Sequence, residues 1–369
     1  MSQYVGIITY HNAINYGAVL QAYALSKQLH IMGIDCNILD YRCTAVDIQY
    51  KCRGRKNCSS WKNFIAHNLT CILRYTKKKN FKRFQKLLPL STACDCRNLE
   101  RITRKYSTFI TGSDQVFNPV CNKSDPTYFL NFVKKGSKNA FSASMGSISQ
   151  FESSCLDTLS MLSSFDSISM RETDAANYLS QKTGKQCAVT MDPIWLLNKN
   201  EWEKIATFNK RKPYILVYNL MDLAYMRKFA IELSKKTGLP IISVNRTIMG
   251  DATYILHSHL ASNCSPSDFV GYIENAEYVV TDSFHGASFS ILFGKKLFVG
   301  LNKEKDNTNS RLITILERAG LLNRIIDDQT ISNFNATICY EELYPRLTSS
   351  IESSKEYLKK ICLIGETSV

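Results

Sequence analysis

Tyr4-Val-Gly-Ile-Ile-Thr9 begins the pattern that decides the fold, because apolar and β-branched residues bounded by polar ones indicate a short buried strand. Residues Ala18–Leu29 then favour a helix by propensity, and Gly33 follows the end of that helix. Ile34-Asp-Cys-Asn-Ile-Leu-Asp-Tyr41 returns as a second strand. A strand, a helix and a strand within about 40 residues form a βαβ unit, which predicts a parallel sheet.

The same alternation continues along the chain and predicts two α/β domains. Further strands are expected at 106–111, 138–144, 167–170, 189–193, 213–219, 241–245, 278–281 and 296–300. Helices are expected at 152–165, 171–179, 226–237 and 287–293, and Ser265 is expected to cap another. The simplest architecture is two Rossmann-like, doubly wound domains facing a cleft. We expect them at residues 1–185 and 186–345, followed by a C-terminal helix and tail at 346–369.

The net charge of +14 on these 369 residues is concentrated in one segment. Residues 42–105 hold 17 Lys or Arg and three acidic residues, whereas the rest of the chain holds 29 basic and 29 acidic residues. This basic segment is expected to be helical, with Trp61, Phe64, Phe81 and Phe84 as packing anchors. It is either a solvated insertion or a surface for an anionic partner, such as a membrane or a phosphorylated ligand.

Composition excludes several classes of protein. Hydrophobic residues make up 44% of the chain and charged residues 21%, which is typical of globular proteins and excludes wholesale disorder. No apolar stretch is long enough for a spanning helix, and the N-terminus lacks the pattern of a secretory signal. We therefore expect a cytoplasmic protein whose 13 cysteines are reduced thiols. Cys52, Cys58, Cys94 and Cys96 lack zinc-finger spacing, so no metal site is expected.

Two polar segments near the N-terminal strands could carry chemistry, because ligands of parallel sheets bind beyond the carboxyl ends of the strands. In His11-Asn-Ala-Ile-Asn-Tyr-Gly17, the Gly at the helix start permits a close backbone approach by an anion or hydroxyl. The alternative is ordinary turn chemistry. In Gly112-Ser-Asp-Gln115, Asp114 could act as a general base or hold sugar hydroxyls, or it could be the N-cap of the following turn.

Two later segments have the same placement. Arg171, in Ser169-Met-Arg-Glu172, could clamp a phosphate or carboxylate, or it could pair with a nearby acid. Thr281-Asp-Ser-Phe-His-Gly-Ala-Ser288 runs from a strand into a helix and places His285 beside free backbone amides. There His285 could donate a proton or stabilise departing phosphate, or it could be structural.

Taken together, these segments resemble the polysaccharide pyruvyl transferase family. The resemblance rests on six pieces in family order: Ile7–Leu25, Thr111–Pro119, Phe141–Gly146, Ser169–Asp174, Met191–Leu196 and Thr281–Ser288. It implies a fold similar to that of the two-domain GT-B glycosyltransferases. It also implies transfer of an enolpyruvyl group from phosphoenolpyruvate to a sugar of a polysaccharide or its precursor, which gives a pyruvate ketal.

The resemblance also implies roles for individual residues. His285 corresponds to the family's late His, so we expect it to act in catalysis together with Asp114. The donor is expected at Arg171, Ser283, His285, Gly286 and Arg311, with the C-terminal domain as the donor side. The acceptor is expected on the N-terminal side, at Asn12, Asn15, Tyr16, Gly17, Gln115 and Asn118. Phosphoenolpyruvate is a substrate here, and no cofactor is expected.

The expected partners are phosphoenolpyruvate and a saccharide acceptor, of which a lipid-diphosphate-linked saccharide is one form. The basic segment would then hold the enzyme peripherally at the inner face of the membrane. One alternative is a GT-B-type glycosyltransferase that uses a nucleotide-sugar donor. Another is nucleic-acid binding through stacking on Trp61, Phe64, Tyr75, Phe81 and Phe84, but this leaves residues 106–325 unexplained, so no nucleic acid is expected.

Overall fold

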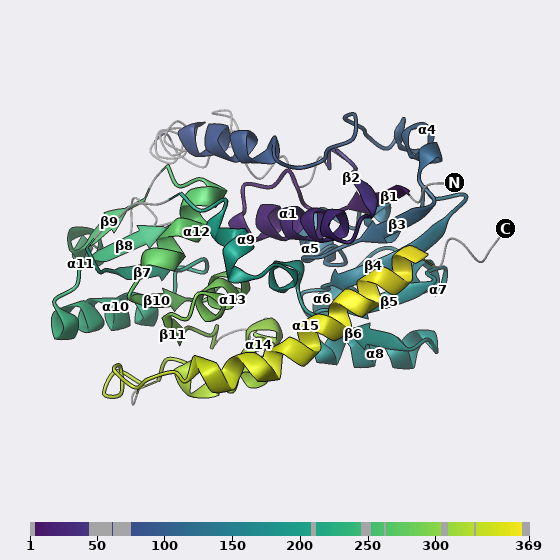
Figure 1. Ribbon diagram of the computed structural model, residues 1–369. Helices are drawn as coiled ribbons and strands as arrows, with labels where there is room; N and C mark the ends of the chain where they lie inside the picture. Colours follow the sequence, from purple (N-terminus) through teal and green to yellow (C-terminus); the bar gives the residue numbers. More distant parts are fainter. Residues whose placement is uncertain are drawn as a thin grey trace. The chain divides into compact units, whose positions relative to one another are not determined.

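The structure is a computed structural model that describes residues 4–43, 61, 75–207, 212–244, 252–261, 263–303, 309–327 and 330–363. The chain forms two compact units. The first is built from Met1–Tyr50, Gln85–Leu197 and Thr348–Val369, and the second from Lys51–Phe84 and Asn198–Leu347. Each unit contains one parallel sheet with helices beside it (Figure 1).

The first unit has a six-stranded parallel sheet in the order β2-β1-β3-β4-β5-β6. Its strands are β1 (Tyr4–Ile8), β2 (Asp35–Ile38), β3 (Thr108–Thr111), β4 (Ser137–Ala143), β5 (Ser167–Met170) and β6 (Cys187–Val189). The chain builds outward from β1 to β2 and then crosses to β3 on the other side. The strand order therefore reverses between β1 and β3, which is the place where such sheets bind ligands.

Helices lie against both faces of this sheet. The longer ones are α1 (Tyr16–Ile31) and α8 (Thr173–Thr183), and the shorter ones are α4 (Leu99–Ile102), α5 (Pro119–Asn122), α6 (Ile148–Glu152), α7 (Thr158–Ser163), η2 (Thr103–Lys105), η3 (Pro126–Phe129) and η4 (Pro193–Leu196). Leu25 of α1 packs in one apolar cluster with Ile7 and Ile110, whereas Leu179 of α8 packs in another with Ile168. The alternation of side chains along each strand explains why both faces are apolar.

The second unit repeats this plan with five parallel strands in the order β11-β10-β7-β8-β9. They are β7 (Ile215–Tyr218), β8 (Ile241–Val244), β9 (Ser258–Leu260), β10 (Tyr278–Thr281) and β11 (Lys296–Val299). The strand order reverses between β7 and β10. The second unit therefore has its own switch point, at the carboxyl ends of these two strands.

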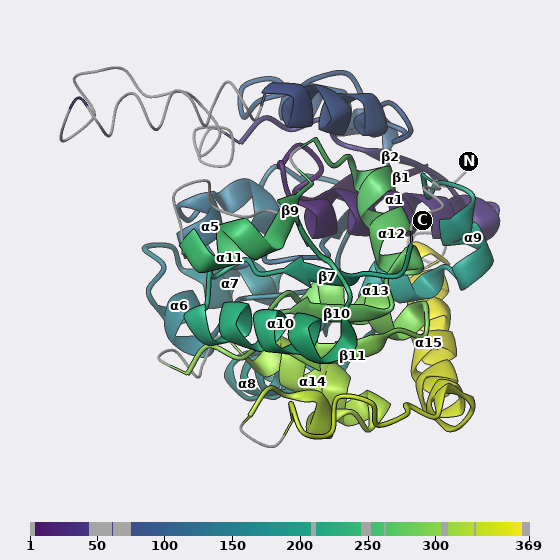
Figure 2. The same cartoon turned by 90° about the vertical axis from the view of Figure 1, so that its left-hand side faces the viewer.

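The helices of the second unit are α9 (Lys199–Glu203), α10 (Ala224–Thr237), α11 (Ala252–His257), α12 (Pro266–Asn275), α13 (Phe284–Leu292), α14 (Ser310–Ala319) and η6 (Leu322–Arg324). Helix α10 contacts β7, β8 and β10 (Figure 2). On the other face of the sheet, the Tyr218 ring packs edge-on against Phe269 of α12. The Ser265 cap is confirmed, since Ser265 and Asp268 form a complete capping box.

The structure differs from the sequence-based expectation at three places. Strand β6 belongs to the first sheet, so that sheet extends past residue 185. The helix expected at 152–165 is two short helices, α6 and α7, each with its own polar cap at Ser147 and Asp157. Within the basic segment a helix spans residues 75–85; Phe81 and Phe84 are buried as expected, but Trp61 is 55% exposed. Phe64 lies outside the described residues.

The last helix, α15 (Tyr340–Leu363), is divided between the two units at Thr348. Its C-terminal part packs on the first unit, where Leu358, Ile361 and Cys362 are fully buried with Ile7 and Phe141. No described helix of the chain is both long enough and apolar enough to cross a membrane.

We expect Leu358→Ala to lower the free energy of unfolding by about 2–5 kcal/mol, because it removes a fully buried side chain and leaves a cavity. Chemical denaturation followed by circular dichroism measures this difference. Lys359→Ala is the matched control, since it is an exposed position on the same helix turn. Equal stability of the two variants would show that the end of α15 does not belong to the core of the first unit.

Candidate functional site

The loops that follow β1 and β3 are joined by hydrogen bonds at the switch point of the first unit. The Thr9 hydroxyl donates to the Ser113 carbonyl at 3.2 Å, and Gln21 of α1 links both loops. Its amide nitrogen donates to Thr9 Oγ1 at 2.7 Å, and its amide oxygen accepts from the Ser113 N–H at 3.1 Å. Gly112 has φ +114°, and a Cβ there would lie 2.4 Å from the Phe141 carbonyl oxygen, so the turn requires glycine.

A buried His–Asp pair lies beside this switch point. His11 Nε2 is 2.9 Å from Asp40 Oδ1, and His11 Nδ1 is 3.2 Å from the Thr9 carbonyl. Because both partners accept, His11 makes both hydrogen bonds only when both ring nitrogens carry hydrogen. Arg42 donates to the other Asp40 oxygen at 2.7 Å. Burial raises the pKa of Asp40, but the hydrogen bonds and charges of His11 and Arg42 outweigh burial and lower this pKa overall.

Arg171 is buried among three carboxyl groups. Its NH1 donates to Asp192 Oδ2 at 2.8 Å, its NH2 lies 3.8 Å from Asp114 Oδ1, and its Nε lies 3.5 Å from Glu172 Oε1. The Ser113 hydroxyl also donates to Asp192, at 3.0 Å. Burial lowers the pKa of Arg171, but the three acids outweigh burial and raise this pKa overall. The structure thus shows Arg171 in the ion-pair role that the sequence left as the alternative to a donor clamp.

The switch point of the second unit is organised by Thr281 and Asp282. The Thr281 hydroxyl donates to the Tyr218 carbonyl at 2.7 Å and accepts from the Ser283 N–H at 3.0 Å. The Asp282 carboxylate accepts from the consecutive N–H groups of residues 220 and 221, at 2.6 and 2.7 Å. Burial raises the pKa of Asp282, and this effect outweighs the opposing hydrogen bonds from the backbone. Asp282 therefore fixes the loop after β7 to the end of β10.

Helix α13 begins at this same point. The Ser283 side chain caps it by accepting from the Gly286 N–H at 3.2 Å, and His285 lies in its first turn, 8% exposed. A Cβ on Gly286 would lie 2.6 Å from Thr281 Oγ1, so glycine lets the helix pack closely against the strand end. The arrangement combines an imidazole with the N-terminus of a helix, where developing negative charge is stabilised.

A family model, polysaccharide pyruvyl transferase, matches residues 15–301. The chain belongs to the polysaccharide pyruvyl transferase family. The matched range contains both switch-point segments at Gly112–Gln115 and Thr281–Ser288. No curated protein sequence matches the chain.

The two parallel sheets and the likeness to a solved glycosyltransferase show that this family member has a GT-B-like fold of two Rossmann-like domains. The glycotransferase of kitacinnamycin has a TM-score of 0.53 and 8% identity, with 99% of both chains covered. The UDP-GlcNAc 2-epimerase of Neisseria meningitidis has a TM-score of 0.46 and 11% identity, covering 98% of this chain and 94% of the other. The spinosyn forosaminyltransferase SpnP has a TM-score of 0.41 and 10% identity, covering 100% and 96%.

The predicted acceptor residues of this transferase-family chain lie in the first unit and make structural contacts. Asn15 caps α1 by accepting from the Ala18 N–H at 3.2 Å, while Tyr16 and Gly17 are buried in its first turn. Asn118 caps α5, and its amide donates to the side chain of Gln115 at 2.7 Å. The structure places Asn12 half-buried in the loop before α1. Acceptor binding by these residues stays a prediction.

The predicted donor residues divide between the units. Arg171 lies in the first unit, whereas Ser283, His285 and Gly286 lie together in one turn of the second. Arg311 is half-buried in the first turn of α14, also in the second unit. Sequence reasoning missed Asp40, Asp192 and Asp282, although each lies shortly after the end of a strand (β2, β6 and β10), as Asp114 does after β3.

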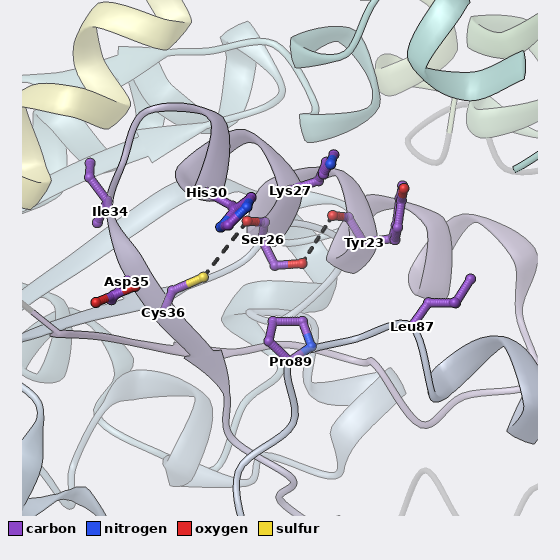
Figure 3. A pocket seen from close by; sticks show the side chains of 9 residues that line it. All are labelled: Tyr23, Ser26, Lys27, His30, Ile34, Asp35, Cys36, Leu87 and Pro89. Carbon is purple, nitrogen blue, oxygen red and sulfur yellow. Dashed lines mark hydrogen bonds between the residues drawn. The ribbon is translucent and has the colours of Figure 1, made fainter. Parts of the chain in front are cut away.

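An open pocket of about 230 Å³ in the first unit is lined by other residues (Figure 3). Its lining includes Lys27 and His30 of α1 and Asp35 and Cys36 of β2. Burial and Asp35 raise the pKa of Cys36 to about 12, and its thiol donates to the Ser26 carbonyl at 3.8 Å. This pocket lies beside the start of β2, the opposite end of that strand from the switch-point loops, and its thiol stays protonated at neutral pH.

We expect Asp40→Asn to lower the free energy of unfolding at pH 7 by about 2 kcal/mol, because it removes the buried carboxylate that binds His11 and Arg42. The folded-state pKa of Asp40 is below its unfolded value, so its contribution is complete above pH 4, roughly, and is lost as pH falls through the folded pKa. Urea denaturation at a series of pH values measures the difference from the unaltered protein. A difference that stays constant down to pH 2, roughly, would contradict an ionised Asp40.

We expect Arg171→Met to lower the free energy of unfolding by about 3–5 kcal/mol, because it leaves buried carboxylates without their cation. Arg97→Met is the matched control: Arg97 pairs with Asp95 on the surface, with 86% of its side chain exposed, and its loss should change stability little. If both variants are equally stable and Arg171→Met loses phosphoenolpyruvate binding instead, Arg171 is the donor clamp.

Proposed function

We propose that the chain transfers the enolpyruvyl group of phosphoenolpyruvate to a sugar of a polysaccharide or its precursor and forms a pyruvate ketal. Membership of the polysaccharide pyruvyl transferase family supports a pyruvyl transfer. The observation that carries the proposal is the placement of His285, buried in the first turn of α13 at a topological switch point. A helix N-terminus and an imidazole suit a donor that carries a phosphate and a carboxylate.

The reaction needs two hydroxyl groups of the sugar. One attacks C2 of phosphoenolpyruvate while the methylene carbon gains a proton and becomes a methyl group. The bond from C2 to the phosphate oxygen then breaks, and the second hydroxyl bonds to C2 and closes the ketal. The two hydroxyl protons are balanced by the one on the methyl group and the one on the released phosphate. We assign His285 as the general acid or the group that stabilises the departing phosphate, a role worth about 10²–10⁴-fold in rate.

The remaining assignments follow from the contacts. Ser283 and Gly286 shape the α13 N-terminus toward the donor, and Arg311 supplies a cation from α14. Asp114 is the candidate base or orienting group for the acceptor, and its backbone at φ +67° reflects a specially shaped turn. Arg171 is a positioning residue, because Asp192 already binds its guanidinium group.

We expect phosphoenolpyruvate to raise the melting temperature of the protein by several degrees at saturating concentration, because a ligand that binds only the folded state stabilises it. His285→Ala should abolish this shift and the mass gain of one pyruvyl ketal on a saccharide acceptor. His259→Ala is the matched control, since His259 is an exposed histidine of β9 in the same unit. Circular dichroism checks that both variants are folded.

One outcome would contradict the proposed reaction, and another would contradict the role of His285. Stabilisation by a nucleotide sugar, with none by phosphoenolpyruvate, would favour the glycosyltransferase alternative. If His285→Ala transfers the pyruvyl group at the unaltered rate, the chain catalyses the reaction but His285 takes no part in it.

A further inference from the structure

The helix at residues 75–85 has one cationic face and one apolar face. Successive residues of a helix turn by about 100°, so Lys78, Lys79, Lys82 and Arg83 fall within an arc of about 140°, and Lys86 continues this arc just beyond the helix. We call these five residues the basic face. All five are exposed. This helix is the unlabelled blue coiled ribbon in the upper part of Figures 1 and 2.

The opposite face holds the helix to the protein. Phe81 and Phe84 are 1% and 4% exposed, and both lie on the side of the helix away from the basic face. The Asn80 amide donates to the Asn263 carbonyl at 2.7 Å, a second attachment within the second unit. Since the apolar side is already packed, the helix presents its basic face to the solvent.

The charge of the basic face is not neutralised locally. The sequence has no acidic residue between Tyr75 and Cys94. In the part of the chain that the structure describes, none of the five basic side chains forms an ion pair with an acidic residue. Five cations held on one rigid face repel one another, and an anionic surface would relieve that repulsion.

We propose that the basic face binds an anionic lipid surface. Tyr75 lies near the middle of the cationic arc with 70% of its surface exposed, and an amphipathic aromatic ring beside lysines suits the headgroup region of a bilayer. Single-stranded nucleic acid fits less well, because stacking of successive bases needs several accessible rings, and burial of Phe81 and Phe84 leaves Tyr75 as the one accessible ring of the helix at residues 75–85. Contact through the basic face alone makes this a salt-sensitive, peripheral association that inserts no helix into the bilayer.

The test is sedimentation of the full-length protein with two kinds of vesicle. One kind is phosphatidylcholine alone, and the other contains about one third phosphatidylglycerol, which supplies the negative surface potential. We expect binding to the anionic vesicles only, and release when the salt is raised from about 0.1 M to about 1 M, where the screening length falls to about 3 Å. This assay is independent of pyruvyl transfer, so it succeeds or fails apart from the proposed function.

The discriminating variant replaces Lys78, Lys79, Lys82 and Arg83 with Gln, and we expect it to bind anionic vesicles at least about tenfold more weakly. The matched control replaces Lys134, Lys135, Lys228 and Lys235 with Gln. These are exposed elsewhere on the molecule, and the net charge changes equally. The control should bind like the unaltered protein, and circular dichroism should show both variants folded.

Three results would overturn the proposal. The first is equal binding to neutral and anionic vesicles, and the second is equal loss in both quadruple variants, which would indicate net charge alone. The third is a competitor result: if inorganic pyrophosphate or an unrelated single-stranded oligonucleotide binds through the basic face while anionic vesicles do not, the face is a discrete phosphate site or a nucleic-acid site.

Discussion

A parallel strand that is buried on both faces cannot expose polar side chains to a ligand along its length. This constraint determines where the polar groups of both units lie. Every residue of β3, β7 and β10 is buried. Apolar side chains fill the two sides of each sheet, so the polar groups of the chain gather in the loops beyond the strand ends. The reversal of strand order then leaves one place in each sheet where two such loops separate, and there the candidate residues after β1, β3 and β10 lie.

The two units hold their switch-point loops in the same physical way, with a buried polar side chain that binds backbone amides of the neighbouring loop. Gln21 binds the amide of Ser113 in the first unit, and Asp282 binds two consecutive amides in the second. A buried amide that lacks an acceptor costs free energy, so these side chains fix the loops in single conformations. The first unit adds the Arg171–Asp192 pair, which joins the end of β5 to the segment after β6.

The sequence was sufficient for features that depend on short stretches of chain. It predicts the first βαβ unit, the Ser265 cap and the two-domain class, because periodicity, caps and strand ends are local signals. It left the role of Arg171 open because the partner is set by sheet register. Met170 pairs with Val189 across β5 and β6, and this pairing brings the residues that follow both strands together. The sequence also predicted a boundary at 345/346, close to the division at Thr348, but α15 runs through it from Tyr340 to Leu363. Packing of the C-terminal part of α15 on the first unit depends on contacts that its helical pattern does not show.

For the basic segment, the structure distinguishes between interpretations that the amino-acid composition alone does not separate. Its aromatic residues could serve as stacking platforms or as anchors, and its lysines as a ligand site or as a solvated face. Within the helix at residues 75–85, burial of Phe81 and Phe84 makes these rings anchors, and the helical period then forces the cations onto the opposite side. The five cations of the basic face are thus exposed on this helix, whereas Ser283 and His285 at the second switch point are buried. The proposed attraction to an anionic surface and the proposed donor chemistry are therefore assigned to different residues.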